Sequence, residues 1–360
     1  MTQTATRIRV DATSSYDVVI GAGVFDELPT LLHGVSTVAL VHARSLQRLA
    51  DQVATVLTKA GVRCAGVPVP DGETAKELVI AAEVWDSLAE ARISRADAIV
   101  GLGGGATTDL AGFVAATWLR GVRVVHLPTT LLAMVDAAIG GKTAVNTRAG
   151  KNLVGVFHQP SGVLCDLTTL ATVPPEDYVS GLAEVVKAGF IADPEILDLI
   201  EADPAGATRP DGRQTRELIE RAIRVKAAVV GADPLEHGGR EILNYGHTLA
   251  HAIEKTEDFR IRHGNAVSVG LVYAATVSKL AGRLDETTTR RHRQVLTSLG
   301  LPTTYHKAAW PRLSAAMGVD KKVRGGQLRF VVLDGVGKPG LLEAPDQELL
   351  ATAYAEVAQQ

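Results

Sequence analysis

The sequence predicts an α/β domain with a mainly parallel sheet, followed by a mainly α-helical domain. Three observations support this fold class. First, the chain has 360 residues, 46% of them hydrophobic, which is enough for two cores. Second, short β-branched runs alternate with helical patterns over residues 1–167. Third, apolar residues recur at helical spacing from Pro174 to about Leu299, with almost no strand signal. We therefore place the domain boundary between residues 167 and 168.

The first domain is predicted to be built from short buried strands with helices between them. Strands are expected at residues 37–41, 63–69, 98–102, 122–127 and 161–166, and a helix over 73–91. Strands that alternate with helices favour parallel pairing in a sheet covered on its faces.

The second domain is predicted to be helical almost throughout. Helices are expected over residues 178–191, 216–230, 240–255, 266–280 and 287–299. One late run, residues 328–333, is strand-like, and the sequence does not assign its place in the fold.

Composition excludes several classes of partner and location. With 37 basic and 40 acidic residues, the formal charge of −3 offers no global attraction for nucleic acid or an anionic membrane. The only cysteines, Cys64 and Cys165, lie in apolar runs and are typical of core residues in a reducing compartment. The first ten residues lack an apolar signal core, and no stretch reaches a spanning length. A cytoplasmic location is expected.

A glycine-rich turn follows the strand at 98–102. Gly103, Gly104 and Gly105 lead into a helical pattern, so backbone N–H groups at the helix N-terminus could approach a pyrophosphate. On this interpretation the first domain would be Rossmann-like and nucleotide-binding. A tight turn in any α/β domain explains these glycines equally well, since their spacing departs from the strict dinucleotide pattern.

A second glycine motif, at residues 140–143, resembles the end of a P-loop. The first glycine of that motif should stand at position 136, which is Asp136, so an ATPase signature is excluded. Lys142, followed by Lys151 and Asn152, suits a phosphorylated, hydroxyl-rich substrate. A solvated basic loop is the alternative.

Three residues of the helical domain have the chemistry of a catalytic metal site. They are Glu184, His247 and His263, and a Glu/His/His set leaves a fourth coordination position open. A metal held in this way could polarise a substrate oxygen, whereas a structural zinc is normally closed by four protein ligands. The leading interpretation is therefore an enzyme.

Further polar residues lie close to these ligands in the sequence. Lys187 is at i+3 from Glu184 and shares its helix face, although a surface ion pair worth under about 1 kcal/mol would look the same. His251 is at i+4 from His247, as in zinc proteases, but the glutamate of that motif is absent and a protease is disfavoured. His251 could be a metal ligand, could contact a ligand or the substrate, or could simply be packed.

A cluster of charged and polar residues precedes His247. Its density suits a pocket for a carboxylate and a phosphate, although charged helix faces show the same density. The cluster comprises Lys226, Glu236, Arg240 and Asn244.

Taken together, these motifs resemble the 3-dehydroquinate synthase family of sugar-phosphate cyclases, in the family's order from about residue 15 to residue 335. The segments that carry the resemblance are 103–105 with Asp109, 118–121, 128–136, 140–142, 150–152, 181–184, 244–247 and 263–264.

The resemblance implies an NAD- and metal-dependent lyase of the shikimate pathway. Such an enzyme would convert 3-deoxy-D-arabino-heptulosonate 7-phosphate to 3-dehydroquinate and phosphate. The implied cofactors are NAD and one divalent metal, zinc or cobalt. The expected partner is a small phosphorylated sugar acid, with no nucleic acid and no membrane, and a homodimer is expected.

The resemblance also implies roles for individual residues. The metal ligands would be Glu184, His247 and His263. The substrate-pocket residues would be Arg120, Asp136, Lys142, Asn152, Lys187, Lys226, Glu236, Arg240, Asn244, His251 and one of Lys321 and Lys322. The NAD contacts would be Glu73, Lys76, Gly103, Gly104, Gly105, Asp109, Thr129, Thr130, Lys142, Lys151 and Thr172.

Two departures from the family pattern stand out. The chain has His42 and Arg44 after the strand at 37–41, where the family often has an aspartate for the adenine ribose. It also has Asn265 where the family usually has a glutamate, which changes a charge beside the ligand His263.

Three alternatives stay open at this point. One is a sister cyclase of the amino-dehydroquinate or deoxy-inosose type, and another is a metal-dependent polyol dehydrogenase related to glycerol dehydrogenase. The third is a catalytically inactive metabolite-binding regulator, which the intact Lys142, Asn152, Lys187 and ligand set disfavour.

Overall fold

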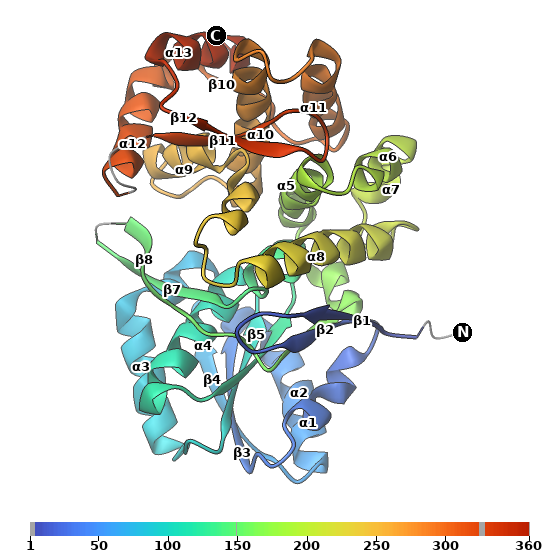
Figure 1. Ribbon diagram of the computed structural model, residues 1–360. Coiled ribbons are helices and arrows are strands. Elements are labelled where there is room, and N and C mark those ends of the chain that lie inside the picture. Colours follow the sequence, from blue (N-terminus) through green and yellow to red (C-terminus); the bar gives the residue numbers. More distant parts are fainter. Residues whose placement is uncertain (1–3, 149, 324–327, 360) are drawn as a thin grey trace. The chain divides into compact units, whose positions relative to one another are not determined.

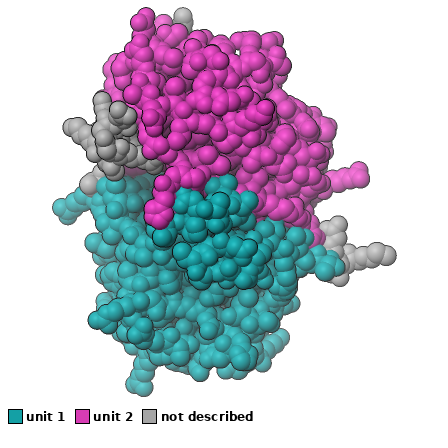
Figure 2. All heavy atoms as spheres, viewed as in Figure 1, with its two compact units in different colours: residues 1–173, 226–235 teal, residues 174–225, 236–360 magenta. Residues whose placement is uncertain are grey.

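The computed structural model describes residues 4–148, 150–323 and 328–359. The chain forms two compact units, coloured separately in Figure 2. Unit 1 comprises Met1–Val173 and Lys226–Leu235, and unit 2 comprises Pro174–Val225 and Glu236–Gln360. The sequence-based boundary assigned residues 226–235 to the helical domain. The structure places them in unit 1, where Lys226 contacts Asp136.

Unit 1 is built on a seven-stranded sheet. In sheet order its strands are β1 (Thr6–Val10), β2 (Tyr16–Gly21), β9 (Gly162–Asp166), β6 (Arg123–Pro128), β5 (Ala98–Gly103), β3 (Thr37–Ala43) and β4 (Arg63–Val69). Every neighbouring pair is parallel except β1 and β2, which are antiparallel. The mainly parallel sheet confirms the predicted fold class, and the β1–β2 hairpin was not predicted.

Helices cover both faces of this sheet, which is why its central strands are apolar throughout. The covering helices are α1 (Leu28–Leu31), α2 (Gln47–Lys59), α3 (Leu78–Glu90) and α4 (Gly105–Thr117). In β5, Ile99 packs into the core beneath α3 and α4, while Val100 and Leu102 pack into the core beneath α1 and α2. Figure 1 shows these helix pairs on opposite sides of the sheet.

A hairpin of β7 (Lys142–Thr147) and β8 (Gly150–Phe157) lies outside the main sheet. Its strand β7 packs on α4. The contact is close at Gly112 of α4, because any side chain there would overlap the Thr143 side chain of β7. Strand β8 is exposed along most of its length.

Unit 2 is mainly helical. Its helices are α5 (Pro175–Ile191), α6 (Glu195–Ala202), α7 (Pro204–Ala207), α9 (His247–Thr256), α10 (His263–Leu280), α11 (Glu286–Ser298), α12 (Trp310–Val323) and α13 (Gln347–Val357), with the first part of α8 (Thr215–Ala232). Helix α10 is the most buried of them and contacts α5, α9, α11 and α13. Among the described residues, no helix is both long and apolar enough to span a bilayer.

Short strand pairs complete unit 2. The strand-like run at 328–333 forms β11 (Arg329–Leu333), which pairs antiparallel with β12 (Pro339–Glu343) and packs on α10. Strands β10 (Tyr305–His306) and β13 (Ala358–Gln359) pair in parallel.

Two predicted helices have different limits in the structure. The helix predicted over 240–255 is wrong as one element, because Gly246 has a left-handed φ of 80° that separates a 3₁₀ turn at Gly239–Asn244 from α9. The helix predicted over 73–91 begins only at Leu78, because Glu77 is extended. As a result, His247 is the first residue of α9, and Glu77 directly precedes α3.

Candidate metal centre

Glu184, His247 and His263 converge in unit 2, and their ligand atoms all lie within 4.8 Å of one another. Glu184 Oε1 is 3.3 Å from Nε2 of His247 and 3.4 Å from Nε2 of His263. No donor among the described residues meets this buried oxygen in hydrogen-bonding geometry. An orphaned carboxylate oxygen facing two imidazole nitrogens fits a divalent cation such as zinc or cobalt.

Close helix packing brings the two histidines to Glu184. His263 is the first residue of α10, and the next residue, Gly264, donates its N–H to Ser180 Oγ at 3.1 Å. A Cβ at Gly264 would overlap the backbone carbonyl of Ser180, so only glycine lets α10 approach α5 this closely. Ser180 lies one turn before Glu184, and the contact therefore sets His263 against Glu184.

The second histidine is positioned in a similar way. His247 is the first residue of α9, directly after the left-handed Gly246. A Cβ at Gly270 of α10 would overlap the Gly246 carbonyl, so α10 also packs directly on the turn that precedes α9. The Nδ1 of His247 is 3.1 Å from the backbone carbonyl oxygen of Tyr245. Because a carbonyl can only accept, Nδ1 carries the hydrogen and Nε2 stays available as a ligand.

The electrostatics of the centre favour bound positive charge. Burial would raise the pKa of Glu184, but Lys187 and His247 hold it well below its usual range. Burial would lower the pKa of His263, but the adjacent carboxylates of Glu184 and Glu254 raise it to about 10. A proton on His263 thus partly supplies the charge that a metal would bring.

Lys187 contacts Glu184 Oε2, the oxygen that does not face the histidines. Both side chains are buried, with exposed fractions of 5% and 3%. The alternative of a solvated surface ion pair is therefore wrong. The two carboxylate oxygens have separate partners, so Oε1 can bind a metal while Oε2 holds the ammonium group.

The other predicted residues of unit 2 differ in their surroundings. Arg240 is almost fully buried, and the side-chain nitrogen of Asn244 has no hydrogen-bond partner within the described part of the chain. His251 is exposed, and its ring lies edge-on to that of His247, with centroids 5.4 Å apart. Glu236 has a left-handed φ of 59°. Lys321 and Lys322 lie near the end of α12, and their side chains lie outside the described residues.

A second polar cluster forms in unit 1. Lys76 is 3% exposed and contacts both Asp109 Oδ2 and Asn152 Oδ1. Burial raises the pKa of Asp109 to about 6, although the adjacent Lys76 opposes the shift. Beside this cluster, Glu73 accepts a hydrogen bond from Asn146 at 2.7 Å and lies 3.5 Å from Lys151 Nζ.

The glycine-rich turn adjoins this cluster through α4. Gly103 ends β5 and Gly105 begins α4, whose N-terminus has no side-chain cap. The carbonyl of Gly103 accepts the N–H of Thr129 at 2.9 Å, and Thr130 is the nearest side chain to a Cβ at Gly104. These backbone groups form the kind of helix N-terminus that binds phosphate groups.

The remaining predicted residues of unit 1 lie at several places. Asp136 and Lys226, far apart in sequence, are in contact. Lys142 and Arg120 are exposed, and Arg120 has a left-handed φ of 66°. Thr172 is also exposed and donates its hydroxyl to the carbonyl of Thr169 at 2.7 Å.

Sequence reasoning missed several residues that support the centre. Glu254 contacts His263, Tyr245 contacts His247, and Ser180 anchors α10. The available signal for Glu254 was its position two helical turns after His247 on the same face of α9. His42, one of the departures, is buried in β3, and its Nδ1 lies 3.0 Å from the carbonyl of Ala43.

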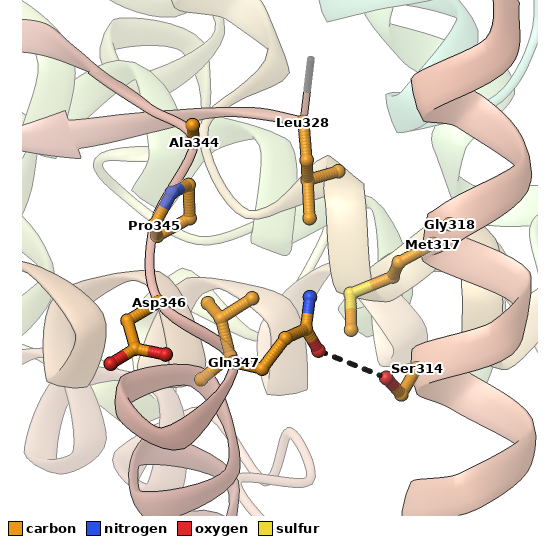
Figure 3. Close-up of a pocket in the computed structure, with 9 residues that line it drawn as sticks. Ser314, Met317, Gly318, Leu328, Ala344, Pro345, Asp346 and Gln347 are labelled. Carbon is orange, nitrogen blue, oxygen red and sulfur yellow. Dashed lines mark hydrogen bonds between the residues drawn. The ribbon is translucent and has the colours of Figure 1, made fainter. Parts of the chain in front are cut away.

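A cavity of about 350 Å³ lies elsewhere in unit 2 (Figure 3). It opens between α12 and the segment from β12 into α13, and Met317, Leu328 and Pro345 contribute to its lining. None of the residues that line it belongs to the metal centre.

Family models and curated relatives identify the family of this chain. Residues 66–180 match the model of the 3-dehydroquinate synthase N-terminal domain, and residues 181–323 match that of the C-terminal domain. A 3-dehydroquinate synthase of Thermobifida fusca is 59% identical over 357 residues, covering 99% of this chain and 97% of the relative. One of Streptomyces avermitilis is 55% identical and covers 100% of both chains.

Solved structures share the fold over nearly the whole chain. A 2-deoxy-scyllo-inosose synthase, solved with carbaglucose-6-phosphate, NAD+ and Co2+, has a TM-score of 0.88 and 27% identity, and the match covers 98% of this chain and 100% of that one. The 2-epi-5-epi-valiolone synthase of Streptomyces hygroscopicus, with NAD+ and Zn2+ bound, also has a TM-score of 0.88 and 27% identity, covering 96% and 97%. From the family models, the full-length relatives and the converging Glu/His/His site, we conclude that this chain belongs to the 3-dehydroquinate synthase family.

Proposed function

We infer that the chain is an NAD- and metal-dependent lyase that converts 3-deoxy-D-arabino-heptulosonate 7-phosphate to 3-dehydroquinate and phosphate. Full-length relatives at 55–59% identity carry this inference, because the sister cyclases of known structure are only 27% identical. The reaction belongs to the shikimate pathway of aromatic amino acid biosynthesis. The convergence of Glu184, His247 and His263 supports this inference, because the three side chains could hold the metal that the reaction requires.

We propose that Glu184, His247 and His263 hold one zinc or cobalt ion. A metal bound there supplies Lewis acidity that polarises a substrate hydroxyl during its oxidation. Glu184 contributes the anionic oxygen, and the two helix N-termini fix the imidazoles. Lys187, buried against Glu184 Oε2, places an ammonium group beside the reacting region, where it can donate to a substrate oxygen.

The polar cluster of unit 1 is proposed to bind NAD, which accepts and then returns a hydride within one catalytic cycle. The Gly103–Gly105 turn suits the pyrophosphate, since its backbone N–H groups lie at a helix N-terminus. Lys76 offers a buried donor, and Asp109 a partly buried acceptor, for cofactor hydroxyls. The further NAD contacts in this proposal are Glu73, Thr129, Thr130, Lys142, Lys151 and Thr172.

We propose that lysine and arginine side chains bind the phosphate and carboxylate of the substrate. Asparagine, aspartate and glutamate side chains would form hydrogen bonds with its hydroxyl groups. The burial of Arg240, Lys187 and Lys226 supports this role, because a desolvated cation binds an anion more strongly than an exposed one. The proposed set is Arg120, Asp136, Lys142, Asn152, Lys187, Lys226, Glu236, Arg240, Asn244, His251 and one of Lys321 and Lys322.

A homodimer is proposed on the basis of the β7–β8 hairpin. Strand β8 pairs only with β7 among the described strands, and four of its apolar side chains are 41–61% exposed: Leu153, Val154, Val156 and Phe157. A long apolar edge strand is a ready surface for pairing with a second copy. An aspartate in place of Val154 should halve the mass measured by sedimentation, whereas one in place of the similarly exposed Val79 on α3 should not.

The location is proposed to be cytoplasmic. Cys64 and Cys165 are both unbridged, and the second is buried in β9, which agrees with a reducing compartment. We propose no nucleic-acid or membrane partner, in line with the near-neutral charge balance.

The proposed reaction is tested by phosphate release from the heptulosonate phosphate, with and without NAD. We expect release to depend on catalytic amounts of NAD and on the metal, without net NADH. Steady accumulation of NADH would indicate a polyol dehydrogenase instead, and binding of the substrate without turnover would indicate a regulator. Equal kcat/KM for the 4-amino analogue would place the chain with the amino-dehydroquinate type.

A further inference from the structure

We propose that Glu254 is a positioning residue that orients His263 as a metal ligand and fixes its tautomer. The proposal rests on the metal site inferred above. Glu254 lies on α9 and is 7% exposed, and its Oε1 is 3.2 Å from Nδ1 of His263. The opposite ring nitrogen, Nε2, faces Glu184 Oε1 at 3.4 Å. The imidazole of His263 is therefore held between two carboxylates, one a ligand and the other behind the ring.

The path of the chain explains how Glu254 reaches this position. His247 begins α9, and Glu254 follows two turns later on the same helix face. The backbone N–H of Phe259 donates to the carbonyl of Glu254 at 2.8 Å, which turns the chain after α9. Helix α10 then begins at His263. Helix α9 thus provides a ligand at its first residue and the support for the next ligand near its end.

The carboxylate determines which nitrogen of His263 is free to bind a metal. An ionised carboxylate only accepts, so Nδ1 carries the hydrogen and Nε2 presents its lone pair once its proton is displaced. Such carboxylate–histidine pairs also raise the basicity of the ligand. His247 receives the same support from the Tyr245 backbone carbonyl, which side-chain substitution cannot remove. His263 is therefore the histidine ligand whose observed support comes from a side chain.

The charge of Glu254 has a second effect. Lys187 contacts Glu184 and offsets the single anionic charge among the three ligands. A buried carboxylate on the far side of His263 restores negative potential at the position where Nε2 and Oε1 converge. A neutral glutamine would keep an acceptor oxygen for Nδ1 but would lose this potential.

The test measures metal affinity rather than turnover. Zn2+ binding to the metal-free full-length chain is followed by competition with a chromophoric chelator, and Co2+ binding by its visible absorption. Glu254→Ala should weaken binding 10- to 100-fold, the usual range for such support. Glu254→Gln should weaken it less. Glu257→Gln is the matched control, because Glu257 follows three residues later and instead accepts a hydrogen bond from Tyr305. It should leave the affinity unchanged.

A double-substitution experiment separates positioning from a general structural role. Glu254→Gln is introduced into both the wild type and the His263→Ala variant. If Glu254 acts mainly through His263, its substitution should weaken Zn2+ binding much less once His263 is gone, because only the loss of its charge then remains. An equal loss in both backgrounds would overturn the proposal, as would wild-type affinity in folded Glu254→Ala and Glu254→Gln variants. Failure of the wild type to bind one metal per chain would instead refute the metal site itself, and the role of Glu254 with it.

Discussion

Gly264→Ala should weaken metal binding although residue 264 is not a ligand. In a helix, alanine is normally more favourable than glycine by about 1 kcal/mol. At this position, however, the new Cβ would lie 2.5 Å from the carbonyl carbon of Ser180 and 2.7 Å from its Oγ. Cβ atoms essentially never approach other atoms within 3.0 Å. Helices α5 and α10 would have to separate locally by on the order of 1 Å to restore ordinary contact distances.

The magnitude follows from this displacement. Overpacking of a closed contact costs about 1–3 kcal/mol, which outweighs the helix-propensity gain. Because His263 precedes Gly264 directly, its Nε2 would move relative to Glu184, and metal sites tolerate deviations of only about 0.2 Å. We therefore expect at least tenfold weaker Zn2+ binding, which corresponds to about 1.4 kcal/mol.

Chelator competition measures the metal affinity, and urea unfolding of the metal-free chain measures the stability. The control is Gly318→Ala on α12, where a Cβ would have no atom within 4 Å and φ is not left-handed. This variant should bind Zn2+ normally and be no less stable. Wild-type affinity in Gly264→Ala would refute the argument that this close helix approach positions His263.

Three further outcomes are expected. Glu184→Ala should abolish stoichiometric Zn2+ or Co2+ binding, because it removes the anionic ligand and leaves Lys187 buried without its partner. Full metal content together with full activity would show that Glu184 is not a metal ligand. Lys187→Ala should retain the metal but lower turnover more than tenfold, about 1.4 kcal/mol or more of transition-state stabilisation, and undiminished activity would remove Lys187 from the mechanism. Burial lowers the pKa of His126 from 6.5 to about 3, so this side chain stays neutral in the folded state. In the unfolded state it takes up a proton below pH 6.5, and the free energy of unfolding therefore falls as the pH drops from 6.5 toward 3. His126→Gln should reduce the loss of unfolding free energy between pH 6.5 and pH 5 by about 2 kcal/mol in urea titrations, and an unchanged pH dependence would contradict this assignment.

The order of elements was predictable because it depends on local patterns. Alternating apolar strands and helical segments predicted the parallel sheet of β3, β4, β5, β6 and β9, and the structure confirms it. The β1–β2 and β7–β8 hairpins were missed. Helix α9 was merged with the turn before it, because the left-handed conformation of Gly246 is set by its packing against α10.

The family and the chemistry of the site were also readable from the sequence, and the full-length relatives confirm the family. Glu184, His247 and His263 stand in distinctive local motifs, and their side chains are of the type that binds zinc or cobalt. The i+3 spacing of Lys187 placed it correctly on the same helix face as Glu184. Helical periodicity fixes such neighbours without knowledge of the fold.

Only the tertiary structure decided how these residues act together. Sequence spacing could not distinguish a solvated Glu184–Lys187 pair from the buried pair observed, because burial depends on how α10 packs on α5. It also could not separate Glu254 from the chain's other acidic residues. Its role depends on α10 returning to α5 through the close contact at Gly264, which brings His263 between the two carboxylates. Residue type and local periodicity are properties of the sequence, whereas distances between helices arise only when side chains and backbones pack.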